Sequence, residues 1–370
     1  MSVPPAPVSN QKPLAMARYN IRETEDYWQA RWAEIGLRPV DADATDMDGL
    51  RARVLDDVVA RYRRARGHGA PATPAFGETA LGRIRHVTYR DGAGAWLEPH
   101  QVMARDDGTW VTLRDGGPVT VGRPVRMAPA ARNTIDPAEA VDSYGADAIR
   151  LFLISNSPPE RDLEWREAGV EAAWRFVNRI WRAVTLCVQD GAWDGAPAAT
   201  AEPGNGPAAV ATLTRVCRTA IQGVTRDLER ARPHTAVAQA RSLANHVLRS
   251  PDAGAADSQI RRVGIETMLR LLSPMTPHVC EALWSLLGHR TMLAQTPWPT
   301  TDRRHRDDDT ISVPVQINGR LRATVEVSRS CGREAMVKRA LAQPVVISLL
   351  AGRSPRRVIA VSQKMVSINL

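Results

Sequence analysis

The chain has few residues of the kinds that form disulfides, metal sites or nucleophilic catalytic centres. Its four cysteines lie far apart and include no C-x-x-C pair, which argues against a disulfide framework and a zinc ribbon. Its eight histidines show no H-x-x-x-H or Cys–His ligand spacing. The sequence has no serine nucleophile elbow and no glycine-rich phosphate loop. We therefore expect no bound metal ion, and the residue patterns indicate no catalytic residue.

Long apolar runs are also missing, so no membrane-spanning helix and no membrane partner are expected. The start of the chain has no charged segment followed by an apolar block, which predicts no signal peptide and a cytoplasmic location. Lysine is scarce and accounts for three of the 49 basic residues. The net charge of +9 favours a polyanionic partner such as nucleic acid. A composition rich in arginine and alanine equally fits a GC-rich genome, and both explanations stay open.

Helical periodicity dominates the first part of the chain after a proline-rich, flexible start at 1–17. It predicts two helices within 18–67, separated by an acidic loop at 40–49. On the first helix, we expect one side to carry Thr24, Tyr27, Trp28, Trp32 and Ile35. On the second, the predicted inward residues are Leu50, Val54, Val58 and Tyr62. The next stretch, 68–125, alternates β-rich runs with D-G and G-G turns and predicts three to five short antiparallel strands.

Helical signals return at Asp136, an N-cap followed by Pro137, with Gly145 ending a short helix. The region 166–300 is predicted to be a helix bundle, with Thr276 capping its last helix. The expected helices are 166–189, 208–231, 234–250, 257–273 and 277–288. The clearest apolar stripe consists of Val170, Trp174, Val177, Trp181, Val184 and Val188.

The last part of the chain, 308–370, changes to a period of two. An N-G dipeptide at 318–319 between two β-rich runs is a strong hairpin signal. A helix near 332–351 and a final strand within 356–370 complete a small α+β domain. The predicted fold class is therefore mainly α, with α+β parts.

Seven of these segments, in this order, resemble leucyl-tRNA synthetase, a class I aminoacyl-tRNA synthetase. They are YNIRETEDYWQARWAE at 19–34, VVARYRRARG at 58–67, NTIDPAEAVDSYGADAIRLFLISNSPPERDLEWREAGVEAAWRFVNRIWR at 133–182, LLSPMTPHVCEALW at 271–284, TPWP at 296–299, VPVQINGRLRATVEV at 313–327 and GRSPRRVIAVSQKMVSINL at 352–370. The resemblance implies a truncated paralogue that lacks most of the catalytic Rossmann domain and the editing domain.

The resemblance also implies a domain for each region. By this interpretation, 18–67 and 68–125 are helical and strand-rich remnants of the catalytic region. The segment 126–165 is a degenerate K-M-S-K-S loop with its stem region. The bundle at 166–300 is similar to an anticodon-binding domain, and 308–370 is similar to the C-terminal domain that contacts tRNA.

Both ATP-binding signatures of that family are degenerate in this chain. The first, H-x-G-H, falls on Asp46, Met47, Asp48 and Gly49. The segment thus carries two carboxylates, Asp46 and Asp48, where the family's two histidines would stabilise phosphoryl charge, and a negative charge there has the wrong sign. The second, K-M-S-K-S, falls on Arg126, Met127, Ala128, Pro129 and Ala130. Pro129 replaces the lysine that grips ATP and can neither donate a hydrogen bond nor carry charge, whereas Asn133 is interpreted as a turn or capping residue.

The resemblance implies tRNA as the partner, and contacts to phosphate need cations on a surface. The candidates in the bundle are Arg175, Arg179, Arg182, Arg215, Arg218 and Arg226. Those in the C-terminal domain are Arg320, Arg322, Lys338, Arg353, Arg356 and Arg357. The competing interpretation of such an arginine stripe is a solvated helix face.

Three functions fit the sequence. The first is a tRNA-binding protein that cannot activate leucine alone and needs no cofactor. The second is a divergent leucine–tRNA ligase, or one completed by a protein partner that supplies a catalytic domain; ATP would be required only in this case. The third is a protein-interaction module or a decaying paralogue that does not bind RNA. DNA is not specifically expected as a partner.

Overall fold

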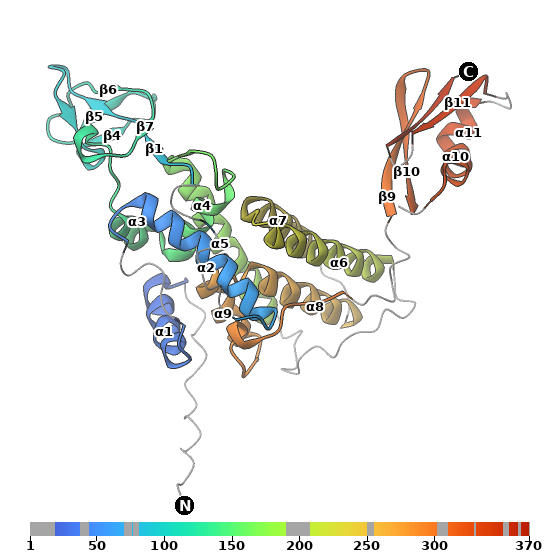
Figure 1. The fold of residues 1–370 in the computed structure, drawn as a ribbon, viewed down its shortest axis with the longest axis horizontal. Coiled ribbons are helices and arrows are strands. Elements are labelled where there is room, and N and C mark those ends of the chain that lie inside the picture. Colours follow the sequence, from blue (N-terminus) through green and yellow to red (C-terminus); the bar gives the residue numbers. More distant parts are fainter. Residues whose placement is uncertain are drawn as a thin grey trace, which may run out of the picture. The chain divides into compact units, whose positions relative to one another are not determined.

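A computed structural model of the chain describes residues 19–37, 44–69, 76, 81–189, 208–249, 255–301, 310–328, 331–350, 355–361 and 364–369. They form two compact units, Met1–Thr300 and Thr301–Leu370 (Figure 1). The first unit combines a helical body with a group of short strands, and the second is a small α+β unit. The predicted fold class is confirmed.

Helices make up most of the first unit. They are α1 (Ile21–Glu34), α2 (Met47–Ala65), α3 (Pro137–Tyr144), α4 (Ala146–Ser155), α5 (Glu167–Gln189), α6 (Ala208–Glu229), α7 (Pro233–Arg249), α8 (Ala255–Leu272) and α9 (Pro277–Leu286). Every predicted helix of this part of the chain is present. The short helix α3 begins as expected, because the Asp136 carboxylate accepts the Ala138 N–H. The prediction missed α4, whose residues 146–154 are all buried, so its sequence shows no polar face.

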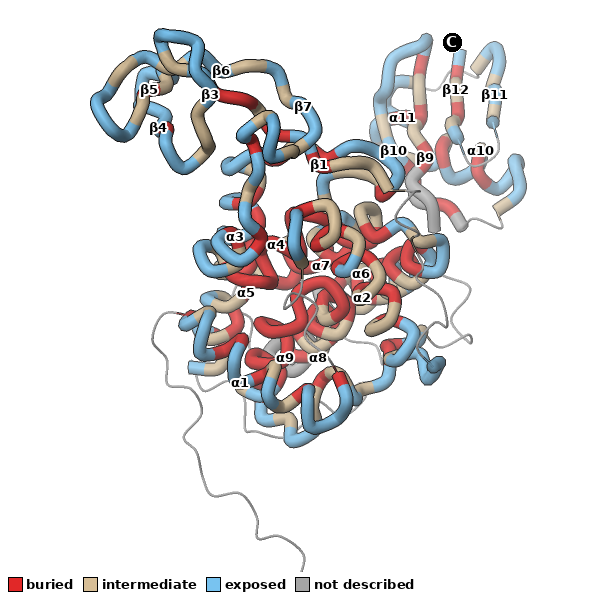
Figure 2. The backbone as a smooth tube through the Cα atoms, turned by 60° about the vertical axis from the view of Figure 1, so that its left-hand side comes forward, coloured by how far each residue is buried: buried red, intermediate tan, exposed pale blue. Residues whose placement is uncertain are grey.

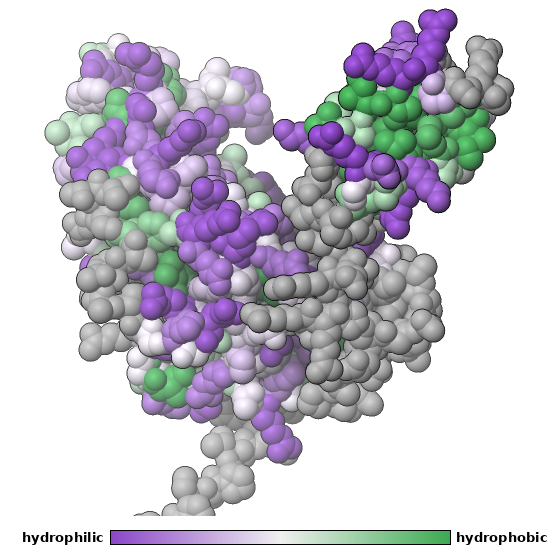
Figure 3. Space-filling model, turned by 45° about the vertical axis from the view of Figure 1, so that its right-hand side comes forward, coloured by the Kyte–Doolittle hydropathy of each residue, from purple (hydrophilic) through white to green (hydrophobic). Residues whose placement is uncertain are grey.

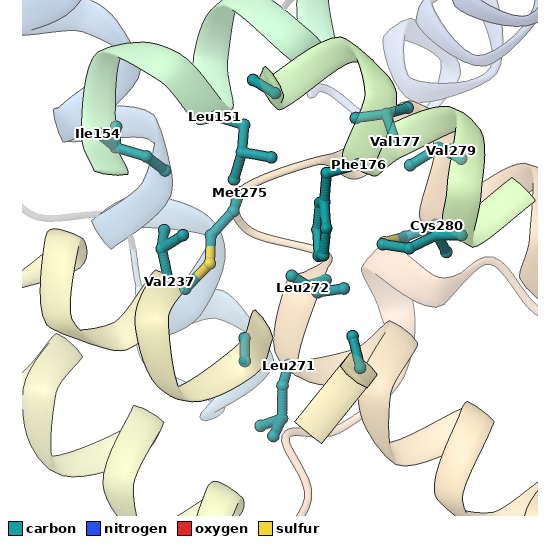
Figure 4. Packing of buried hydrophobic residues seen from close by; sticks show 14 of the residues in the cluster. Leu151, Ile154, Phe176, Val177, Val237, Leu271, Leu272, Met275, Val279 and Cys280 are labelled. Atoms are coloured by element: carbon teal, nitrogen blue, oxygen red, sulfur yellow. The ribbon is translucent and has the colours of Figure 1, made fainter. Parts of the chain in front are cut away.

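One continuous apolar core joins these helices. Buried side chains from α2, α4, α5 and α6–α9 belong to a single cluster, which appears as the red interior of the helical body in Figure 2. Figure 4 shows Phe176 of α5 beside Leu272, Val177 and Cys280 inside this cluster. The predicted inward residues of α2 are all buried. The N-terminal helices and the bundle therefore share one core.

Two details of the predicted helix faces are wrong. Tyr27 and Ile35 are 44% and 37% exposed, so the buried side of α1 is narrower than expected and rests on Trp28 and Trp32. On α5, Trp174 is 38% exposed, and Phe176 occupies the core instead. Large aromatic residues can lie at the margin of a helix stripe, where the sequence period does not decide on which side they fall.

Buried carboxylates tie the ends of these helices together. The Glu25 carboxylate of α1 accepts the Ala146 N–H at the start of α4, at 2.7 Å. One residue later, the Asp147 carboxylate accepts the N–H groups of His278 and Val279 at the start of α9, at 3.3 and 2.7 Å. Each carboxylate thus satisfies free amides at the positive end of another helix.

Helix α9 itself supplies a further buried carboxylate of this kind, Glu281. The Glu281 carboxylate accepts the N–H groups of Leu293 and Ala294 and the indole N–H of Trp32. Burial raises the pKa of Glu281, and these donors oppose that rise. Thr276 occupies the N-cap position of α9 without a side-chain capping bond. Thr276 thus has the predicted position, but its side chain does not cap the helix. The Asp147 carboxylate of α4 accepts the free amides instead.

The strand-rich region is more finely divided than predicted. Its seven described strands are β1 (Ile84–His86), β2 (Tyr89–Arg90), β3 (Trp96–Leu97), β4 (Val102–Ala104), β5 (Trp110–Thr112), β6 (Thr120–Val121) and β7 (Val125–Arg126). They form sheets in the orders β7-β1-β8, β3-β2-β6 and β4-β5, where β8 is Leu163–Glu164. The expectation of three to five strands undercounts them. β1 also pairs in parallel with β8, which only a tertiary contact could reveal.

The second unit is a four-stranded sheet with two helices. Its elements are β9 (Thr310–Ile317), β10 (Arg320–Ser328), α10 (Arg333–Leu341), α11 (Pro344–Leu350), β11 (Arg357–Val361) and β12 (Met365–Asn369). The sheet order is β10-β9-β12-β11. The predicted hairpin turn is confirmed, since Asn318 and Gly319 both have the positive φ of the favoured two-residue turn.

Two predictions for this unit are wrong. The single helix expected at 332–351 is two helices, because Pro344 starts a new one. The single final strand is two antiparallel strands, β11 and β12, paired from Arg357 with Asn369 to Val361 with Met365. The unit exposes apolar side chains at Leu321, Val345, Ile347, Leu349, Ile359 and Val361. Figure 3 shows a green, hydrophobic patch on this unit, bordered by purple, hydrophilic residues.

Candidate functional site

The segment aligned with the first ATP signature is the start of helix α2, not the loop that was predicted to extend to residue 49. Asp46 is the N-cap, and its carboxylate accepts the Gly49 N–H at 2.7 Å. Met47 is 2% exposed and belongs to the core. Gly49 lies within the first turn, and a Cβ atom there would come 3.1 Å from the Asp46 carboxylate. Three of the four signature positions therefore serve the helix end.

The fourth position, Asp48, connects the two degenerate signatures. One oxygen of its carboxylate accepts the Ile84 N–H at 2.7 Å. The other oxygen lies 3.5 Å from the Arg83 guanidinium and 3.6 Å from that of Arg126. Arg126 is the first residue of the second signature, so both signature segments meet at one carboxylate. The side chain of Asp48 is 19% exposed and thus partly shielded from water.

The rest of the second signature links strand β7 to helix α3. Met127 packs against the core, and its N–H bonds to the Ile84 carbonyl at 3.0 Å. Pro129 begins a single 3-10 turn, Pro129–Ala131, which ends at Arg132 with φ of +46°. The Ala128 N–H donates to the Asn133 side chain at 3.0 Å. Hydrogen bonds therefore fix this segment as the connection between β7 and α3, and Pro129 starts its turn.

Asn133 is the centre of this connection and is fully buried. Its amide nitrogen lies 3.0 Å from the His86 carbonyl, 3.3 Å from that of Val125 and 3.4 Å from that of Arg126. The backbone carbonyl of Asn133 in turn lies 3.1 Å from Nδ1 of His86. Burial lowers the pKa of His86, and the Asn133 carbonyl opposes that shift. Asn133 therefore acts as a turn residue whose side chain bonds to the backbone of Ala128 and of strands β1 and β7.

The charged groups that meet at this point are the Asp48 carboxylate and the guanidinium groups of Arg83 and Arg126. An added anion would be repelled by Asp48 and would compete with it for both guanidinium groups. The described residues include no lysine within either signature segment.

The bundle candidates differ in their surroundings. Arg175 pairs with Glu171 at 3.0 Å, and Arg226 with Asp227 at 3.3 Å. Arg215 and Arg218 of α6 also have interaction partners. Arg179 donates to the Asn245 side chain at 2.7 Å, and Arg182 is exposed. The candidates lie on α5 and α6, which pack against different neighbours: α5 mainly against α4 and α9, and α6 against α7 and α8.

The candidates in the second unit are exposed where the structure describes them. Arg320 and Arg322 lie on β10, Lys338 on α10, and Arg356 and Arg357 at the start of β11. Arg353 lies outside the described residues. β10 and β11 are the two edges of the sheet, so the structure does not bring these cations together on one strand pair.

Three residues that the sequence did not single out prove important. Arg51 of α2 is 1% exposed and donates to the carbonyls of Gly82, Pro158 and Arg161. Arg83 is a partner of Asp48. Arg241 of α7 lies over the Phe176 ring, with 4.8 Å between its guanidinium carbon and the ring centroid. All three depend on long-range contacts, and an arginine-rich sequence offers no signal to distinguish them.

None of the helices that the structure describes has the length and apolarity to cross a membrane. In the same part of the chain, no three side chains of His, Cys, Asp or Glu are grouped so that they could hold a metal ion.

Comparisons with known proteins identify the class of the helical region. Residues 211–336 match the family described as the anticodon-binding domain of tRNA ligase. The match begins in α6 and extends into the second unit.

The relatives are more specific. The leucine–tRNA ligase of Rhodospirillum rubrum is 40% identical over 351 residues, which are 94% of this chain and 39% of that protein. The leucine–tRNA ligase of Rhodospirillum centenum is 37% identical over 335 residues, covering 86% of this chain and 38% of that protein. Among solved structures, a LeuRS-tRNA-LeuAMS ternary complex from Agrobacterium radiobacter K84 matches with a TM-score of 0.55 and 27% identity, over 66% of this chain and 31% of that one.

The chain is thus a relative of leucyl-tRNA synthetase that carries an anticodon-binding domain. It spans about two fifths of the length of the curated relatives it matches.

Proposed function

We propose that this protein binds tRNA through its helix bundle and second unit, and that it does not activate leucine by itself. The observation that carries the proposal is the anticodon-binding match over 211–336, on helices whose surfaces bear several arginines. The related synthetase from Agrobacterium radiobacter K84 was solved in complex with tRNA. A net charge of +9 supports association with a polyanion of this kind.

The second half of the proposal rests on the degenerate signatures. In the proposed alignment, Asp48 stands in the first signature and Arg126 in the second, and these two residues pair with each other. Pro129 stands where the family has its second lysine. Catalysis of leucine activation needs cations directed at developing phosphate charge, and a carboxylate at their centre opposes that need.

Leucine-dependent exchange of pyrophosphate into ATP tests this half. We expect the purified chain to give only the background rate measured without leucine. The leucine–tRNA ligase of Rhodospirillum rubrum, assayed in parallel, serves as the positive control. Exchange above background by the purified chain alone overturns the proposal and favours a divergent ligase.

A second candidate, a ligase completed by a protein partner, is distinguished in the same assay. The exchange rate of the chain mixed with a lysate of its own source is compared with that of the lysate alone. An increase that requires the chain overturns the non-catalytic proposal. No increase, together with tRNA binding, supports it.

A further inference from the structure

One pair of arginines in the bundle has a strongly unbalanced charge. Arg179 of α5 and Arg241 of α7 lie over the same aromatic ring, that of Phe176, with their guanidinium carbons 5.2 and 4.8 Å from its centroid. Phe176 is 6% exposed and is anchored in the apolar cluster of Figure 4. Both guanidinium groups are therefore held near a rigid, buried support at the junction of two helices.

No carboxylate of the described residues forms an ion pair with either arginine. Among the residues that the structure describes, the polar partner of the Arg179 guanidinium is the neutral side chain of Asn245, at 2.7 Å. The Arg241 Nε is buried and has no hydrogen-bond partner among these residues. Burial lowers the pKa of Arg241, and the positive charge of Arg179 lowers it further. The two positive charges beside one ring repel each other, and an anion bound between them would relieve this repulsion.

Two other arginines of the bundle each have a carboxylate partner. Arg175, one turn before Arg179 on α5, has Glu171 at 3.0 Å. Arg226 on α6 has Asp227 at 3.3 Å. Arg182, one turn beyond Arg179, is exposed like it and extends the unneutralised group along α5. Arg179 and Arg182 on α5, and Arg241 over the same ring as Arg179, therefore form a group of arginines without a carboxylate partner among the described residues.

We infer that Arg179 and Arg241, with Arg182 beside them, form a phosphate-binding site that contacts the backbone of a bound RNA. This inference rests on the proposed tRNA binding and names where on the bundle one of its contacts lies. A guanidinium fork is suited to a phosphodiester group because it can donate two parallel hydrogen bonds to its oxygens. Binding would also supply the missing counter-charge, so the site favours RNA without reading its sequence.

The test compares the salt dependence of tRNA binding for the full-length protein and its single variants. Arg179→Gln and Arg241→Gln each remove one charge. Arg175→Gln is the matched control, because Arg175 was a candidate from the sequence alone and the structure pairs it with Glu171, which removes it from the proposed site. We expect the first two to weaken binding about tenfold at low salt, and to reduce the slope of log K against log salt by about one. Arg175→Gln should change affinity less than about twofold.

Arg241 is half-buried, so its glutamine variant could lose folded structure. Arg241→Lys keeps the charge and loses the guanidinium fork, so it separates loss of folding from loss of charge. The slope of log K against log salt should stay as in the wild type, and the affinity should fall by less than in Arg241→Gln. Arg179 is exposed, and its variant should keep the thermal midpoint of the wild type. If the wild-type protein does not bind tRNA, the proposed function itself fails. If it binds while Arg179→Gln and Arg175→Gln behave alike, the site is refuted and the proposed function stands.

Discussion

Substitution of Asp48 tests most sharply how the start of α2 is joined to strands β1 and β7, because its carboxylate contacts both strands. Asp48→Ala removes the acceptor of the Ile84 N–H and both ion pairs, whereas Asp48→Asn keeps a neutral acceptor of the same shape. The Ile84 N–H lies at a buried residue, and losing its charged acceptor costs about 1.5–3 kcal/mol. Loss of a negative charge in the first turn of α2 adds roughly 0.5 kcal/mol.

The two ion pairs add little to this sum. The side chains of Arg83 and Arg126 are 44% and 62% exposed, so water screens both pairs, and each contributes about 0–1 kcal/mol. We therefore expect Asp48→Ala to destabilise the first unit by about 2–4 kcal/mol and Asp48→Asn by about half as much. At roughly 2 °C per kcal/mol, the thermal midpoint should fall by about 4–8 °C for the alanine variant.

Differential scanning calorimetry measures the midpoint, and hydrogen exchange of the peptide that contains Ile84 measures the local effect. Exchange of the Ile84 amide should accelerate in Asp48→Ala and change less in Asp48→Asn. A midpoint for Asp48→Ala within 1 °C of the wild type, with unchanged exchange at Ile84, would show that Asp48 does not connect the two segments.

Two further changes test other parts of the first unit. Arg51→Met should lower the free energy of unfolding by about 2–4 kcal/mol because three carbonyls lose their donor, whereas Arg53→Met at an exposed position of α2 should have little effect; equal denaturant midpoints for the two would contradict this role for Arg51. Burial lowers the pKa of His86 below its ordinary value of 6.5, so the unfolded chain takes up a proton at a higher pH than the folded chain does. The contribution of neutral His86 to the free energy of unfolding is therefore complete above pH 6.5 and is lost as the pH falls below that value towards the folded-state pKa. Between pH 7.5 and 5.5, the wild type should therefore lose up to about 1.4 kcal/mol more stability than His86→Asn, and parallel pH profiles in calorimetry would refute this.

Local signals predicted much of the fold. The N-G dipeptide at 318–319 specifies its hairpin, and the Asp136-Pro137 pair specifies the start of α3, because both act within a few residues. Helix α4 was missed because it is buried on every side and shows no helical period in its polarity. The division of the last helix at Pro344 was a readable signal, since proline favours the first turn of a new helix.

The candidate site was less predictable, because its contacts join distant residues. Asp48 and Arg126 were each singled out from the sequence, but nothing local indicates that they meet at 3.6 Å. The bundle arginines were chosen from one helix face, and that pattern cannot show that Glu171 neutralises Arg175 while Arg179 has no such partner among the described residues. Arg241 was missed entirely, because its role depends on a ring that another helix supplies.

Binding of leucine tRNA, measured by fluorescence anisotropy from 50 to 200 mM salt, tests the central claim most directly. We expect saturable binding that weakens steeply as salt rises, with a slope of log K against log salt that corresponds to several phosphate contacts. We also expect an unrelated RNA duplex of the same length to bind more weakly at every salt concentration. Affinity for tRNA no higher than for that duplex, or no saturable binding at 50 mM salt, would contradict the account and favour a protein-interaction role.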